Sequence, residues 1–110
     1  QLDRADFIRP GAPWLVVVFT SASCQACGAV MDTARPLESD QVAVQEVEVG
    51  ADRRVHDRYR IDAVPLVAVV DGDGVVRAHH LGPVTEAHLR GTLVEVREPG
   101  STPDGRGAGD

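Results

Sequence analysis

The feature that most constrains the fold is an uninterrupted apolar run, WLVVVF, at residues 14–19. A strand without alternating polar residues is buried on both faces, as in the interior of a parallel sheet. The run therefore predicts a central strand whose sheet is covered by other elements on both sides. It is the longest apolar run in the chain, and it is far too short to span a bilayer, which takes about 20 apolar residues.

The other elements follow from hydrophobic spacing and turn residues. DGDG at 71–74 is a strong hairpin signal between two apolar segments, which predicts an antiparallel pair. The expected order is helix 2–9, strand 14–19, helix 24–39 with a kink at Pro36, strand 42–49, helix 50–60, strand 65–70, strand 75–81 and a helix from Thr85. A βαβ unit followed by a ββα unit implies an α/β fold, a mixed sheet of about four strands with helices on both faces.

Length and charge restrict the class of protein further. The 110 residues make one domain, expected over 1–98, and the Gly/Pro-rich segment 99–110 is predicted to be a disordered tail. The net charge of −6 argues against a nucleic-acid partner, because no basic stripe could neutralise phosphates.

The compartment stays open at this point. The chain begins with Gln1 rather than Met, so a leader or membrane anchor upstream remains an alternative. The expected localisation is cytoplasmic, or extracytoplasmic and membrane-anchored if an N-terminal segment is missing.

The only two cysteines, Cys24 and Cys27, lie directly after the predicted central strand, at the predicted start of a helix. Ser21 and Ser23 are candidate caps for this helix. The first turn of a helix leaves backbone N–H groups unpaired and carries partial positive charge, which stabilises a thiolate. The pair is therefore a candidate for disulfide exchange, with Cys24 as the attacking thiolate and the more buried Cys27 as the resolving thiol.

Two other interpretations compete with the redox pair. A zinc site needs two further ligands, and the candidates His56, His79, His80 and His88 form no second motif with metal-ligand spacing. The cysteines could also form an inert local disulfide or remain idle thiols. Their position between strand and helix favours the redox pair, with no metal and no organic cofactor.

Several segments, in the right order, resemble the thioredoxin family over about residues 13–97. VVVFTSASCQACGAV resembles the active-site strand, CxxC and helix, and RYRIDAVP at 58–65 resembles the segment that ends in the family's cis-proline. LVAVVDGDGVVRAHHLG resembles the closing hairpin and its terminal glycine, Gly82. The resemblance implies a cis Val64–Pro65 peptide that faces the cysteines and pairs with an extended substrate.

Some positions depart from the family pattern. The sequence around the pair is Ser-Cys-Gln-Ala-Cys, without the usual aromatic residue before Cys24 and without the usual proline between the cysteines. Val18 stands where many members carry a buried Asp, and Glu46 corresponds to the Lys that often accompanies it. Glu46 is interpreted as a solvated strand residue, with a proton-transfer role toward Cys27 as the alternative.

The sequence thus predicts a thioredoxin-like thiol–disulfide oxidoreductase with Cys24 and Cys27 as catalytic residues and Val64 and Pro65 as substrate-binding residues. The expected partners are protein disulfides or dithiols and an unidentified redox partner. We expect a monomer and, from the resemblance and the Lys-free composition, a bacterial source. The alternatives are a redox-inactive interaction module and a zinc-binding protein.

Overall fold

The computed structural model describes residues 1–98 and Gly100. Apart from Gly100, the predicted tail at 99–110 lies outside the described residues. The strands are β1 (Trp14–Thr20), β2 (Val42–Glu48), β3 (Leu66–Asp71) and β4 (Val76–Leu81). They form a four-stranded sheet in the order β2-β1-β3-β4. β1 is parallel to β2 and antiparallel to β3, and β3 is antiparallel to β4.

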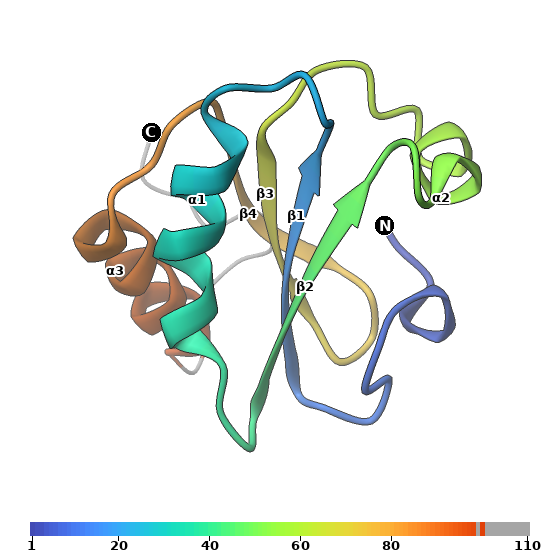
Figure 1. Cartoon of the computed structure of the whole chain (residues 1–110). Helices are drawn as coiled ribbons and strands as arrows, with labels where there is room; N and C mark the ends of the chain where they lie inside the picture. Colours follow the sequence, from blue (N-terminus) through green and yellow to red (C-terminus); the bar gives the residue numbers. More distant parts are fainter. Residues whose placement is uncertain (99, 101–110) are drawn as a thin grey trace.

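The helices are α1 (Cys27–Ala34), α2 (Arg53–Arg58) and α3 (Glu86–Arg97), with short 3-10 turns η1 (Arg4–Asp6) and η2 (Arg35–Leu37). α1 and α3 cover one face of the sheet, and α2 and the N-terminal segment lie on the other (Figure 1). The predicted α/β fold, a four-stranded mixed sheet with helices on both faces, is confirmed.

β1 is the central strand that the apolar run predicts. Val16 and Val18 point into the core cluster shared with α1 and α3, and both are fully buried. Leu15, Val17 and Phe19 point into a second cluster on the opposite face. Since both faces of the strand are packed, no position from 15 to 19 tolerates a polar residue without a partner.

Three predicted helices are shorter than expected, and the one expected over 50–60 is limited to α2. The helix expected over 24–39 begins only at Cys27 and ends at Ala34, because Pro36 has no N–H to continue the helical ladder and lies instead in η2. The helix expected over 2–9 is reduced to η1. The last helix begins as predicted, with Thr85 accepting a hydrogen bond from the His88 amide.

The N-terminal segment is tied down by buried and local hydrogen bonds. The Arg4 side chain is buried, and its guanidinium donates to the carbonyl oxygens of Ala12 (2.7 Å), Arg9 (2.8 Å) and Asp71 (3.3 Å). The Leu2 amide donates to Gly74 O at 2.7 Å. Gly74 has a φ of +87°, and a Cβ there would come within 1.9 Å of Leu2 O, so the hairpin requires glycine at this position.

Within the described part of the chain, no helix has both the length and the apolar character needed to cross a membrane.

Candidate functional site

The two cysteines form a disulfide at the end of the sheet where β1 finishes. Cys24 and Cys27 are bonded, with their Cα atoms 5.5 Å apart. Cys27 is the first residue of α1 and is 4% exposed, whereas Cys24 lies in the preceding turn and is half-buried. Cys24 is therefore the more accessible residue of the pair.

The turn between β1 and α1 sets this arrangement. The Cys24 amide donates to Ser21 O at 3.2 Å, which folds the chain back before the helix starts. The predicted caps are wrong: the Ser21 and Ser23 hydroxyls contact each other at 3.4 Å, and the N-cap residue is Ala26, without a side-chain cap. The Cys27 amide donates a long hydrogen bond to Cys24 O at 3.5 Å, and no side-chain oxygen of the described residues caps α1. The partial positive charge of the first turn therefore faces the cysteine pair without a competing side-chain cap.

Val64 and Pro65 lie beside the cysteine turn. Phe19 pairs with Leu66 at the end of the β1–β3 ladder, so Thr20 and Ser21 leave β1 at the end of the sheet where Val64 and Pro65 enter β3. Ser21 of the cysteine turn and Val64 line the same cavity. The turn after β1 and the start of β3 accordingly lie at one end of the sheet (Figure 1). The Val64–Pro65 peptide bond is cis, and Pro65 O accepts a hydrogen bond from the Gly82 amide at 2.9 Å.

The Val64 backbone carries unused hydrogen-bonding capacity. Within residues 1–98 and Gly100, neither its N–H nor its C=O has a hydrogen-bond partner, although Val64 is half-buried. Backbone polar groups left unpaired in a partly buried position are costly unless water or a ligand satisfies them. Within the described residues, Val64 therefore has an unpaired donor and an unpaired acceptor at a cavity that Ser21 of the cysteine turn also lines.

Glu46 is exposed on β2, as the sequence predicts, and its carboxylate also binds neighbouring side chains. It pairs with Val18 in the β1–β2 register, and its side chain is 35% exposed. Thr20 Oγ1 donates to Glu46 Oε2 at 2.8 Å, and Arg35 Nη2 lies 3.5 Å from Oε1. Since Thr20 is buried at the last position of β1, the carboxylate satisfies a buried hydroxyl near the cysteine turn.

The four histidines are distributed over the molecule. His56 is 3% exposed, and its Nε2 lies 2.8 Å from Val47 O. His80 and His88 make an edge-to-face ring contact with centroids 4.9 Å apart, while His79 is exposed on β4. In the part of the chain that the structure describes, no three His, Cys, Asp or Glu side chains are grouped as metal ligands.

One residue of the site has no counterpart in the sequence-based prediction. Glu48, the last residue of β2, accepts hydrogen bonds from the amides of Gly50 (2.8 Å) and Ala51 (3.0 Å). These bonds, the one from Gly50 foremost, hold the pKa of Glu48 below its usual value. A carboxylate two residues before a glycine at a strand end is a weak sequence signal, so it escaped prediction.

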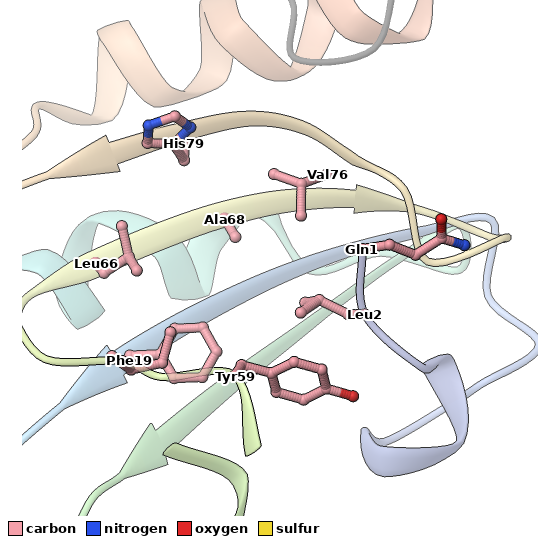
Figure 2. Close-up of a pocket in the computed structure, with 9 residues that line it drawn as sticks. Gln1, Leu2, Phe19, Tyr59, Leu66, Ala68, Val76 and His79 are labelled. Carbon is pink, nitrogen blue, oxygen red and sulfur yellow. The ribbon is translucent and has the colours of Figure 1, made fainter. Parts of the chain in front are cut away.

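Two concave regions adjoin the site. The smaller, about 160 Å³, is lined by Ser21, Val49, His56, Ile61, Asp62, Ala63 and Val64. The larger, about 280 Å³, is mostly apolar and lies against the sheet face opposite α1 and α3, between β3, β4 and the first residues of the chain (Figure 2). Ile61 lines both cavities and separates them.

Comparisons with known proteins identify the fold. No protein-family model matches the sequence, and neither does any curated protein. Among solved structures, thioredoxin O2 from Arabidopsis thaliana in the oxidized state is 22% identical, with a TM-score of 0.67 over 88% of this chain and 92% of that one. A mutant thioredoxin from Halobacterium salinarum NRC-1 is 19% identical, with a TM-score of 0.68 over 79% and 77% of the two chains.

A third structure, described as that of a malarial protein, is 15% identical, with a TM-score of 0.68 over 78% of this chain and 99% of that one. At these identities the likeness is one of fold. The chain has a thioredoxin-like fold with a CxxC disulfide, as the sequence predicts.

Proposed function

We propose that the protein carries out thiol–disulfide exchange on protein substrates through Cys24 and Cys27. The observation that carries this proposal is the unequal placement of two bonded sulfurs at an uncapped helix N-terminus: Cys24 is half-buried and Cys27 is buried. A thiolate at such a position is stabilised by the N–H groups of the first turn, so it forms readily and leaves readily.

In the reducing direction, the Cys24 thiolate attacks one sulfur of a substrate disulfide. A mixed disulfide forms, and the other substrate sulfur leaves as a thiolate. The Cys27 thiolate then attacks the Cys24 sulfur, which restores the Cys24–Cys27 bond and releases the second substrate thiolate. Two electrons pass from the cysteine pair to the substrate, and the substrate thiolates take up two protons. A dithiol partner reduces the pair again.

The Val64 backbone supports binding of an extended substrate segment. Its N–H and C=O groups have no partner within residues 1–98 and Gly100, and Val64 lies beside the turn that holds Cys24. A strand-like segment can pair with both groups, as in β-strand addition, while its disulfide lies over Cys24. Pro65 restricts the backbone of the preceding residue, Val64, toward the extended conformation that this pairing requires.

A redox titration with mass detection tests the exchange. We expect the intact protein to interconvert between a dithiol and a disulfide form that differ by two hydrogen atoms. The Cys27→Ser variant should accumulate mixed disulfides through Cys24, because the resolving thiol is missing, while Cys24→Ser should accumulate far fewer. A folded protein whose thiols resist oxidation would instead support a redox-inactive interaction module. Trapping only in Cys24→Ser would reverse the two roles.

A further inference from the structure

The smaller cavity lies beside Val64, the residue at which the proposed function places an extended substrate segment. Its wall includes Ser21, whose carbonyl holds the Cys24 amide, and Val64, whose backbone groups are free for pairing. A segment paired with Val64 therefore directs alternate side chains toward this wall.

The size and lining of the cavity suit a single side chain. Its volume of about 160 Å³ is well below the roughly 300–1,000 Å³ of pockets for drug-sized ligands. Val49, Ile61 and Val64 supply an apolar wall along which a long aliphatic stem can lie.

The carboxylate of Asp62 at the rim of the cavity favours an aliphatic side chain that ends in a cation. The Asp62 side chain is exposed, and no hydrogen bond or ion pair to it occurs among residues 1–98 and Gly100. Nε2 of His56, the other ionisable group in the lining, is engaged with Val47 O at 2.8 Å. The net charge of −6 adds a field that attracts cations toward the protein.

We propose that this cavity receives a Lys or Arg side chain of the protein substrate, adjacent to the substrate's disulfide, with its cation at Asp62. The proposal rests on the proposed exchange activity and adds the class of substrate: proteins with a basic residue beside the reactive cysteine. The stem lies on Val49, Ile61 and Val64, and the charged head remains partly in water, where an ion pair adds modest but selective binding.

Symmetrical disulfide-linked dimers of a single-cysteine peptide provide the test. Three peptides differ only in the two residues that flank the cysteine. Both are Lys in the first peptide, Gln in the second and Glu in the third. The rate constant for reduction of each peptide by the dithiol form of the full chain is measured from the released peptide thiol. We expect the Lys peptide to react about two- to fivefold faster than the Gln peptide at low salt, which is the range of an exposed ion pair. High salt should shrink this ratio.

Asp62→Asn should bring the Lys-to-Gln ratio close to one, and Asp62→Arg should favour the Glu peptide. Asp40→Asn is the matched control, because it makes the same charge change before β2, at the opposite end of the sheet, and should leave the ratio unchanged. An unchanged ratio in Asp62→Asn, or no preference in the unmodified protein while the Gln peptide is reduced, would overturn the cavity assignment alone. Failure to reduce any of the peptides would overturn the exchange activity as well.

Discussion

At the scale of single residues, Glu48 holds the turn that follows β2. Its carboxylate accepts hydrogen bonds from the amides of Gly50 and Ala51 before α2. The neighbouring Val49 amide donates to Thr20 O at 2.9 Å, which connects this turn to the end of β1. Glu48 therefore stabilises a turn that is joined to the last residue before the cysteine turn.

The free energy of unfolding should rise from acidic to neutral pH, and the Glu48→Gln substitution should make this rise smaller. The hydrogen bonds lower the pKa of Glu48 in the folded state, so the folded protein binds fewer protons than the unfolded chain. The contribution is complete above the unfolded pKa of about 4.3 and is lost as the pH falls through the folded pKa.

Free energies of unfolding measured by urea titration at a series of pH values test this dependence. The unmodified protein should exceed Glu48→Gln in stability near neutral pH, and the difference should shrink toward acid. Glu95→Gln on the exposed side of α3 is the control and should show no such trend. A constant difference across the series would contradict the titration of Glu48 as its cause.

At the scale of the elements, β3 is packed unequally along its length. Val67, Val69 and Val70 are fully buried. Ala68 points toward the larger cavity instead, where Phe19 from β1 and Val76 from β4 leave space (Figure 2). Ala43, on β2, belongs to the same core cluster but lines neither cavity that adjoins the site.

Ala68→Val should stabilise the protein, because two methyl groups enter existing space and a β-branched residue suits a strand. We expect a gain of about 1 kcal/mol in the free energy of unfolding. Ala43→Val adds the same atoms at a fully buried position that lines neither cavity, and it should cost about 1–3 kcal/mol. Urea denaturation of the two variants measures both effects. Equal destabilisation by the two substitutions would contradict the presence of a usable cavity.

At the scale of the whole molecule, the sequence predicts those features that local patterns determine. The burial of β1 follows from its apolar run, the hairpin from DGDG and the start of α3 from Thr85. The start of α1 was predicted three residues too early, because Ser21 and Ser23 resemble caps while the turn they belong to extends to Ala26. Capping depends on the path of the turn, which composition alone does not specify.

The candidate site, too, has one part that a local sequence pattern reveals and other parts that depend on the folded arrangement. The cysteine pair is visible in the sequence because both residues lie in one short motif. The smaller cavity is not, since Ser21, Val49 and Asp62 come from three loops that meet only after the sheet has formed. The position of Val64 beside Ser21 likewise depends on the β1–β3 register.

The molecule is held together without relying on its disulfide. Two core clusters, one on each face of the sheet, contain the large buried side chains, and neither contains a cysteine. The disulfide joins two residues with a sequence separation of only 3. Closing so short a loop lowers the entropy of the unfolded chain, which raises the free energy of unfolding by about 2 kcal/mol. An exchange catalyst has to remain folded in both redox states, and this arrangement meets that requirement.

Reduction with a dithiol should therefore lower the free energy of unfolding by about 2 kcal/mol and leave the protein folded. The Cys24→Ser, Cys27→Ser double variant should match the reduced protein, since both lack the crosslink. Urea denaturation gives the free energies, and far-UV circular dichroism reports the secondary structure before denaturation begins. Loss of structure on reduction would identify the disulfide as a structural staple, in line with an inert local disulfide rather than a redox pair.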